Sequence, residues 1–532
     1  MILASVDFLC FLLIGLTLYY LFPGRYQWIT LLLLSLAFYV QGGYTALLYI
    51  LFTTVSVWGA ALGIDHINER TKTHIREKKS ECSAECQKRL RNAAKTKCRA
   101  VFLLALLSNF AILCVLKYYN FVAQYAMELA NVITGRASEY QRIDFLIPLG
   151  LSFYTFQAVS YLIDVYNKKC RAERNPAKFL LFVSFFPQII QGPIGRYDQL
   201  SRQLTQERYF DIKEIEHGAV LMLWGYLMKL VIADRMAPCV SMIFSNPAAY
   251  GGCIAVVGVV FYALQLYADF AGGIFIMTGA AQMFGVQLAP NFKRPYFSTS
   301  LSDFWRRWHI SLGAWMRDYL FYPLAMSKPM TRMCKKIKNT HPHLSRTLPA
   351  VIGNVIVFLV VGIWHGAQWS YIFWGLYNGI MLALSAMLDP IFKMLNSHLP
   401  QRLLKSAVWH VVRVIRTFVV VCIGYYFDRC ATIGDAALML WRTISSPQLV
   451  QMTDGTLMKL GLIQSDFWIL GISLILLFMI SLLQERGVRI REWMDKQCIV
   501  IRWGIIYLLV FYVAAFAVTN VTELEAFMYA AF

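Results

Sequence analysis

The chain has 532 residues, 58% of them hydrophobic and 15% aromatic, with a mean hydropathy of +0.52 and a formal net charge of +20. A chain of this length that is so apolar is not a soluble globular protein, and many of its apolar runs reach the about 20 residues that a helix needs to cross a bilayer. Continuous rather than alternating runs indicate helices and not a β-barrel. The positive charge gathers in short stretches between apolar runs, which is typical of cytoplasmic loops and argues against a nucleic-acid-binding protein.

Twelve apolar segments are predicted to form membrane-spanning helices. The first has no basic segment before it and no clear cleavage site after it, so we expect a retained helix and not a signal peptide. Three basic stretches, 65–99, 168–178 and 328–346, are expected in the cytoplasm, where they can contact anionic lipid. The predicted spans are 6–22, 28–40, 44–64, 100–116, 145–166, 218–233, 253–270, 349–364, 369–387, 408–426, 467–483 and 499–518.

The segment 179–197 does not fit a simple span. Its two prolines and two glycines interrupt an otherwise apolar helix and leave Gln188 and Gln191 at membrane depth. Broken backbone at that depth is tolerated only where it is buried in protein or lines a cavity. We therefore predict a re-entrant segment there.

The segment 302–322 is predicted to be one amphipathic helix, with Ser302 or Asp303 as its N-cap. Helical spacing puts Arg306 and Arg317 opposite an aromatic face, with His309 at the border between the two. Two interpretations remain open, an interfacial anchor or a helix that lines a water-filled opening. In the second, the two arginines can hold a phosphate or pyrophosphate of an activated donor. The aromatic face consists of Phe304, Trp308, Leu312, Trp315 and Tyr319.

His365 ends the apolar run 355–364 and precedes Gly366, a candidate cap. An ionisable group at membrane depth is expensive and is a functional-site hypothesis by default. One interpretation is a structural hydrogen bond between helices, and the other is a general base in a cavity. No phosphate loop, nucleophile elbow or His-Glu-x-x-His pattern occurs, and Cys82 and Cys86 lack a second tight pair, so we expect neither a metal nor a bound cofactor.

Five segments, in order, resemble the membrane-bound O-acyltransferase family, in particular its bacterial branch, which includes alginate O-acetylation proteins and the D-alanyl transfer protein of teichoic acid modification. The resemblance covers about residues 1–430 and is weaker over 431–532. One departure follows Asp269-Phe270, where Ala-Gly-Gly-Ile-Phe replaces the Ser-Gly-Tyr-Ser-Asp that is common in the family. The segments are Pro-Leu-Gly-Leu-Ser-Phe-Tyr-Thr-Phe-Gln at 148–157, Phe-Pro-Gln-Ile-Ile-Gln-Gly-Pro-Ile at 186–194, Ala-Leu-Gln-Leu-Tyr-Ala-Asp-Phe at 263–270, Asp-Phe-Trp-Arg-Arg-Trp-His-Ile-Ser-Leu-Gly-Ala-Trp-Met-Arg-Asp-Tyr-Leu at 303–320 and Gly-Ile-Trp-His-Gly-Ala at 362–367.

The resemblance implies a fold and a site. The fold is an all-α polytopic membrane protein, with 11 or 12 transmembrane helices plus re-entrant or interfacial helices around a central tunnel, in one integral domain over 1–532. His365 is implied as the catalytic residue and general base, and His309 as the second catalytic histidine. The side chains of Trp364 or Gln188, or backbone N–H groups, are candidate donors to the oxyanion of the tetrahedral intermediate. The expected substrate-binding residues are Trp305, Arg306, Trp308, Arg317, Asp318, Gln188, Gln191 and Trp364.

The expected function is transfer of an acyl group, most simply acetyl, from a cytoplasmic thioester across a bacterial plasma membrane to a cell-surface or extracellular polysaccharide. The donor is acetyl-CoA or an acyl carrier protein, and an extracytoplasmic acetyltransferase is the expected partner, with membrane lipids around the chain. D-alanyl transfer from a carrier protein to teichoic acid is the alternative within the same family. A transporter or lipid flippase is the alternative from another class, and such proteins often carry inverted repeats.

Overall fold

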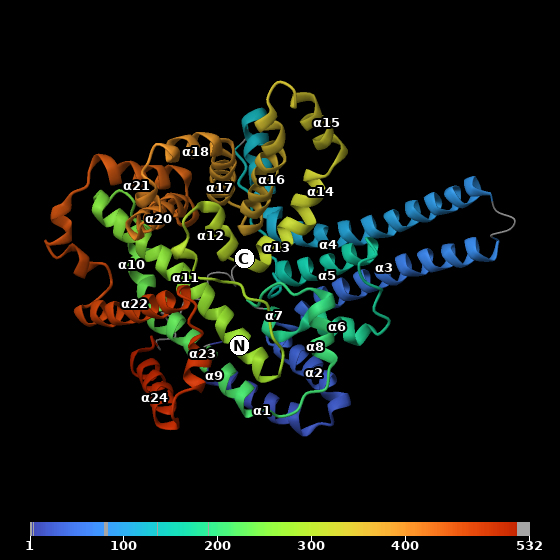
Figure 1. The fold of residues 1–532 in the computed structure, drawn as a ribbon, viewed down its shortest axis with the longest axis horizontal. Coiled ribbons are helices and arrows are strands. Elements are labelled where there is room, and N and C mark those ends of the chain that lie inside the picture. The colour runs from blue at the N-terminus through green and yellow to red at the C-terminus, as the bar shows by residue number, and fades with distance from the viewer. Residues whose placement is uncertain (1–2, 4, 79–82, 136, 190, 519–532) are drawn as a thin grey trace. The chain divides into compact units, whose positions relative to one another are not determined.

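The computed structural model describes residues 1–532 except 1–2, 4, 79–82, 136, 190 and 519–532. The described residues form helices and no strands, which confirms the predicted all-α class (Figure 1). They divide into two compact units. Unit 1 is Met1–Gly218 with Ala280–Ala289, and unit 2 is Ala219–Gly279 with Pro290–Phe532. The single domain over 1–532 stays a prediction.

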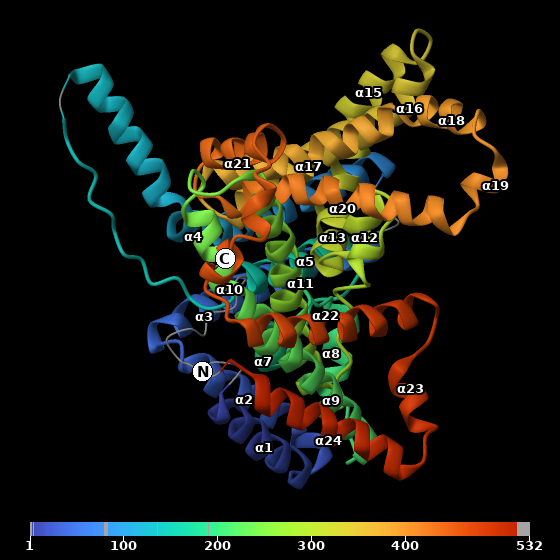
Figure 2. The ribbon, with the colours of Figure 1, turned by 90° about the vertical axis from the view of Figure 1, so that its left-hand side faces the viewer.

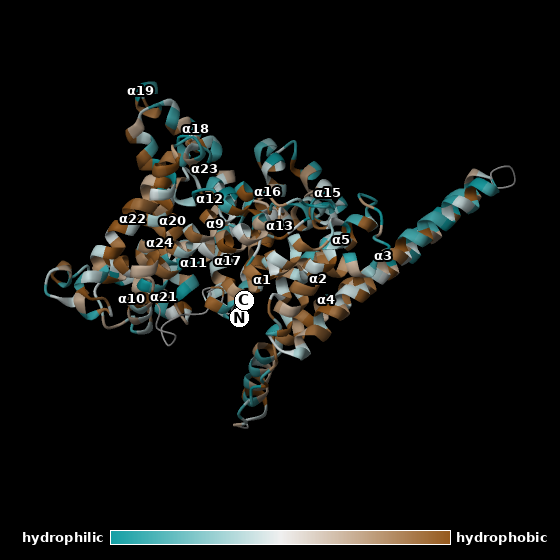
Figure 3. Cartoon of the chain, turned by 90° about the horizontal axis from the view of Figure 1, so that it is seen from below, coloured by the Kyte–Doolittle hydropathy of each residue, from teal (hydrophilic) through white to brown (hydrophobic). Residues whose placement is uncertain are grey.

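Unit 1 contains two long antiparallel helices, α3 and α4, which lie side by side (Figures 1 and 2). The basic stretch 65–99, expected as a loop, is mostly helical, because α3 continues to Glu77 and α4 begins at Ala84. Ser83 caps α4 by accepting a hydrogen bond from the backbone N–H of Cys86 at 3.2 Å, and the residues after it are good helix formers. In Figure 3 the ends of α3 and α4 that belong to this stretch are teal, the colour of hydrophilic residues. The helices are α1 Val6–Leu21, α2 Gln27–Val40, α3 Tyr44–Glu77, α4 Ala84–Thr134, α5 Leu151–Tyr166, α6 Pro176–Ser184, α7 Phe186–Ile189, α8 Tyr197–Thr205 and, at the boundary, α9 Ile212–Tyr226.

Unit 2 contains most of the longer helices and both π-helical segments, η2 Leu227–Ala233 and η4 Arg317–Phe321. It also holds a short 3₁₀ turn, η3 Pro295–Phe297. The α-helices are α10 Asp234–Ser245, α11 Gly252–Met283, α12 Leu301–Arg307, α13 Ile310–Met316, α14 Tyr322–Ala325, α15 Lys328–Ile337, α16 Pro342–His365, α17 Trp369–Met387, α18 Asp389–Ser397, α19 Gln401–Leu404, α20 Ala407–Arg429, α21 Ile433–Ser445, α22 Gln464–Glu485, α23 Ile490–Asp495 and α24 Ile499–Phe516.

Among the described residues, seven helices are long and apolar enough to cross a membrane: α3, α4, α11, α16, α20, α22 and α24. An eighth is present if α17 and α18, which are bent by 53° where they meet, count as one span. This number is lower than the 11 or 12 expected because several predicted spans are short helices. The predicted span 145–166, for example, becomes helical only at Leu151, after a proline and Gly150 in the left-handed region at φ +71.

The hairpin of α16 and α17 brings two backbones into direct contact (Figure 2). A Cβ atom at Gly375 would lie 2.3 Å from the carbonyl oxygen of Phe358, and one at Gly362 would lie 2.5 Å from that of Tyr371. Small residues allow such an approach between membrane helices. The contact fixes the end of α16, and His365 is the last residue of that helix.

Asp269, a carboxylate in the middle of α11, has a buried cationic partner. Lys229 Nζ lies 2.7 Å from Asp269 Oδ1 and 2.7 Å from Asp234 Oδ1, and all three side chains are almost fully buried. Buried charges require such pairing. Lys229 lies in η2, so this ion pair joins the π-helical segment to α11.

Candidate active site

His309 lies at a break between two helices, and the predicted continuous helix over 302–322 is wrong. α12 ends at Arg307, α13 begins at Ile310, and His309 has φ +46, in the left-handed region that a non-glycine residue adopts at a cost of about 1–2 kcal/mol. The N-cap of α12 is Ser300, which accepts from the backbone N–H of Asp303 at 3.1 Å, and not Ser302 or Asp303 as predicted. His309 is therefore buried at a turn and does not lie on a helix border.

Asn291 holds this turn in place. Its carbonyl oxygen accepts from the backbone N–H of Ile310 at 2.9 Å. Its side-chain oxygen Oδ1 accepts from the backbone N–H of Ser311 at 3.0 Å and from Ser311 Oγ at 2.8 Å. These bonds replace the helical hydrogen bonds that a continuous segment would make. The sequence interpretation missed Asn291, because an asparagine 18 residues before a histidine gives no local signal.

The same oxygen defines the tautomer of His309. Nδ1 of His309 lies 3.2 Å from Asn291 Oδ1. A backbone N–H can only donate, so the atom facing Ser311 must be the amide oxygen, and Nδ1 of His309 must then carry the hydrogen. Nε2 of His309 is therefore the nitrogen with the lone pair.

The surroundings of His309 are aromatic and favour its neutral form. The His309 side chain is buried, with the ring of Phe270 edge-on at 4.9 Å between centroids. Burial lowers the pKa of the His309 imidazole to about 3, because the charged form loses its hydration. At neutral pH this residue is therefore a neutral base or hydrogen-bond acceptor and not a cation.

His365 lies in the same unit, one aromatic ring away from His309. The Trp364 ring is 6.3 Å from the His309 ring and 5.2 Å from the His365 ring, measured between centroids. His365 is buried and also contacts Trp374 at 4.7 Å. Gly366 follows the helix as its C-cap, in extended backbone. The structure thus brings together the two histidines that the sequence predicted, with Trp364 between them.

The two tryptophans of α12 and its C-terminus have different environments. Trp308 is buried, with its ring 5.0 Å from that of Phe292, and serves as packing. Trp305 contacts Trp374 at 5.8 Å, and the buried Nε1 of Trp305 has no hydrogen-bond partner among the described residues. Because Trp374 also touches His365, Trp305 lies two ring contacts from that imidazole.

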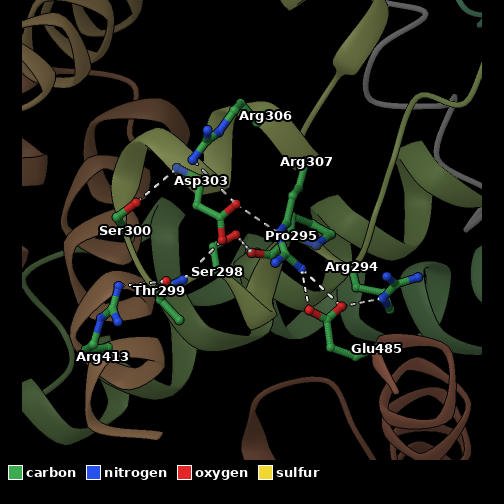
Figure 4. Close-up of polar contacts among 10 residues, drawn as sticks. All are labelled: Arg294, Pro295, Ser298, Thr299, Ser300, Asp303, Arg306, Arg307, Arg413 and Glu485. Atoms are coloured by element: carbon green, nitrogen blue, oxygen red, sulfur yellow. Dashed lines mark hydrogen bonds and ion pairs between the residues drawn. The ribbon is translucent and has the colours of Figure 1, made fainter. Parts of the chain in front are cut away.

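The arginines of this region differ in how far they are neutralised (Figure 4). Arg307 pairs with Asp303 at 3.2 Å, as i,i+4 spacing predicts, and with Glu485 of α22 at 2.9 Å. The side chain of Arg306 is 72% exposed, and its ion pair with Asp303 is long, at 3.9 Å. Arg317 pairs with its neighbour Asp318 at 2.9 Å, and this hydrogen bond raises the pKa of Arg317. Arg306 is therefore more available to an anionic ligand than Arg317.

Gln188 and Gln191 belong to unit 1, whereas the histidines belong to unit 2. The segment around them is broken as predicted, since α6 stops at Ser184 and α7 is a single turn. Gln188 has a structural role, because its Nε2 donates a hydrogen bond to the carbonyl oxygen of Pro193 at 3.0 Å. Gln191 is fully buried, and neither atom of its amide has a partner among the described residues.

Comparison with known proteins finds similarity along most of the chain. The sequence profile of the membrane-bound O-acyltransferase family matches residues 171–333, which include His309. The chain is 32% identical over 441 residues to a probable alginate O-acetylase, AlgI, of Pseudomonas putida, covering 82% of this chain and 78% of the relative. It is 28% identical to the peptidoglycan O-acetyltransferase of Helicobacter pylori over 64% of each chain. It is 30% identical to the teichoic acid D-alanyltransferase of Bacillus subtilis over 52% of this chain and 67% of that protein.

Proposed function

The chain belongs to the membrane-bound O-acyltransferase family and is a multi-pass membrane acyltransferase, and from this premise we propose that it O-acetylates a cell-surface or extracellular polysaccharide. In this proposal the acyl group comes from a cytoplasmic thioester, either acetyl-CoA or an acyl carrier protein, and the membrane is a bacterial plasma membrane. An extracytoplasmic acetyltransferase receives the group or presents the glycan. The observation that carries the proposal is the pair of buried imidazoles separated by one indole ring.

The residues fit the chemistry of acyl transfer. A hydroxyl oxygen attacks the thioester carbonyl, His365 removes the hydroxyl proton as a general base, and the carbon–sulfur bond breaks to release a thiol that takes that proton. His309 presents a neutral Nε2 that can accept a hydrogen bond from the attacking hydroxyl group. The unpartnered N–H of Trp305 is a candidate donor to the oxyanion, beside Trp364.

D-alanyl transfer to teichoic acid is the second candidate. The probable alginate O-acetylase of Pseudomonas putida matches 82% of this chain, and the D-alanyltransferase of Bacillus subtilis matches 52%. The longer match favours O-acetyl transfer. Mass spectrometry of wall and extracellular glycans, with and without the chain, distinguishes the two, because an acetyl ester and a D-alanyl ester differ in mass.

The experiment that tests the mechanism compares two variants of His365. His365→Ala is expected to lower acyl transfer by at least about 10²-fold at unchanged expression and detergent melting, since positioned general bases contribute about 10²–10⁴-fold. His365→Gln retains hydrogen-bonding capacity but cannot accept a proton at neutral pH. Near-normal transfer in His365→Gln would mean that the residue is a structural link between helices. A chain that moves a substrate but never yields an acylated product would be a transporter.

A further inference from the structure

Three arginines lie at α12 and at the residues just before it, and Figure 4 draws two of them, Arg306 and Arg413. Arg413 Nη2 donates to Thr299 Oγ1 at 3.1 Å, and Arg416 Nη2 donates to the carbonyl oxygen of Thr299 at 2.9 Å. Arg306 lies in the last turn of α12, and its side chain is 72% exposed. Arg413 and Arg416 belong to α20, so two helices distant in sequence contribute guanidinium groups to one surface.

The two carboxylates of this region, Glu485 and Asp303, form their shortest ion pairs with Arg294 and Arg307. Glu485 bonds Arg294 at 2.6 Å and Arg307 at 2.9 Å. Asp303 lies nearest to Arg307, at 3.2 Å. In the described part of the chain, neither arginine of α20 forms an ion pair with a carboxylate.

The surface as a whole therefore carries uncompensated positive charge. The region holds five arginines and two carboxylates, which leaves an excess of three positive charges. They are Arg294, Arg306, Arg307, Arg413 and Arg416, with Asp303 and Glu485. Arg413 and Arg416 are one helical turn apart and repel each other, so a shared anion stabilises both. Guanidinium groups bind phosphate oxygens with charge-assisted, often paired hydrogen bonds.

The position of this surface along the helices matches the side on which a donor arrives. The basic stretch 328–346 covers α15 and the first turn of α16, and the α16–α17 hairpin returns the chain to that same side before α20 begins at Ala407. By the positive-inside rule this side is cytoplasmic. Arg413 and Arg416 lie about 9–14 Å into α20, at 1.5 Å per residue. A cytoplasmic ligand with a phosphate can therefore reach them from the interface.

A chain of aromatic contacts connects the surface to the candidate base. Trp305, the neighbour of Arg306, lies 5.8 Å from Trp374, which lies 4.7 Å from His365. The arginines and the imidazole therefore border one continuous aromatic cluster.

We propose that Arg306, Arg413 and Arg416 form a phosphate-recognition surface that holds the phosphate-bearing end of the acyl donor. This inference rests on the proposed acyl transfer and adds two residues of α20 that no motif of the sequence indicated. It also replaces Arg317, which its bond to Asp318 neutralises, as the partner of Arg306.

The test compares acetyl-CoA with S-acetyl-pantetheine, which carries the same thioester without phosphate. In the double variant Arg413→Gln/Arg416→Gln, the ratio of kcat/KM for acetyl-CoA to kcat/KM for S-acetyl-pantetheine is expected to fall about tenfold, the change that one lost charge-assisted contact gives. Because the ratio is internal to one preparation, a lower fraction of folded protein does not change it. The matched control Arg402→Gln/Lys405→Gln removes two exposed charges from the same side and is expected to leave the ratio unchanged.

Each remaining outcome decides the question. An unchanged ratio in the α20 double variant would overturn the phosphate-recognition surface but not the proposed acyl transfer. An equal fall of the ratio in the control variant would mean that the arginines act only through general attraction between opposite charges. Loss of copurified anionic phospholipid in native mass spectrometry, at an unchanged ratio, assigns the arginines to a lipid headgroup and overturns the donor assignment. Absence of transfer from either thioester by the wild-type chain, with an acyl carrier protein thioester also inactive, refutes the proposed function itself.

Discussion

Replacement of Asn291 is expected to change how the activity depends on pH. In the wild-type chain the pKa of His309 is lowered to about 3 by burial, so its imidazole is neutral at every pH between 5 and 8. In the wild-type chain, Oδ1 of Asn291 lies 3.2 Å from Nδ1 of His309. Asn291→Asp keeps an oxygen at this position but makes it part of a carboxylate. Two unit charges about 4 Å apart attract by about 4 kcal/mol at an effective dielectric constant of 20, which is about three pKa units.

In Asn291→Asp the carboxylate therefore raises the pKa of His309 from about 3 to a higher value that lies within the pH range of the assay. As the pH falls through that value the imidazolium forms and Nε2 loses its lone pair. Acyl transfer by Asn291→Asp is thus expected to fall between pH 7 and pH 5, whereas transfer by the wild-type chain shows no step from this residue. The assay is initial rate against pH with a saturating thioester donor.

Asn291→Ala tests the structural part of the same argument. It leaves three donors at the turn without their acceptor, at about 1 kcal/mol or more each, so the free energy of unfolding is expected to fall by about 3 kcal/mol. The tautomer is then no longer fixed, and transfer falls beyond the loss of folded protein. Identical pH profiles for wild type and Asn291→Asp, together with full specific activity in Asn291→Ala, would refute the assignment of the tautomer.

Three further outcomes are expected. Glu485→Gln removes the carboxylate shared by two arginines and should lower the free energy of unfolding by about 2 kcal/mol, measured by denaturation in detergent; an unchanged value would contradict the pairing. Gly375→Ala forces a methyl group against a backbone carbonyl 2.3 Å away and should cost about 1–3 kcal/mol and lower transfer, while Gly471→Ala, with open space around it, should not destabilise. A single cysteine at Thr340, in the basic stretch before α16, should resist an impermeant thiol reagent in intact cells; strong labelling would reverse the topology.

Periodicity and family-like segments predicted the all-α class and the broken segment 179–197, and the catalytic role of the two histidines that they indicated stays a prediction. The break at His309 was not predictable from local pattern, because the aromatic spacing of 302–322 satisfies an uninterrupted helix. The cause is a tertiary one, because Asn291 accepts hydrogen bonds from the backbone N–H groups of Ile310 and Ser311, directly after the break. The helical extensions of α3 and α4 were missed for a different reason. Basic composition was interpreted as a loop, although lysine, arginine and glutamate are good helix formers.

The C-terminal residues, where the resemblance to the family is weakest, take part in the support of the site. Glu485 bonds Arg294 and Arg307, and these arginines lie three residues after Asn291 and two residues before His309. The ion cluster therefore clamps both sides of the hydrogen bond that fixes the imidazole. A general base or acceptor is effective only within a few tenths of an ångström of its productive position, so rigidity at this point has a direct chemical value. It follows that α22 is a structural part of the site, and that a chain truncated before it would retain both histidines without the contacts that hold His309 in place.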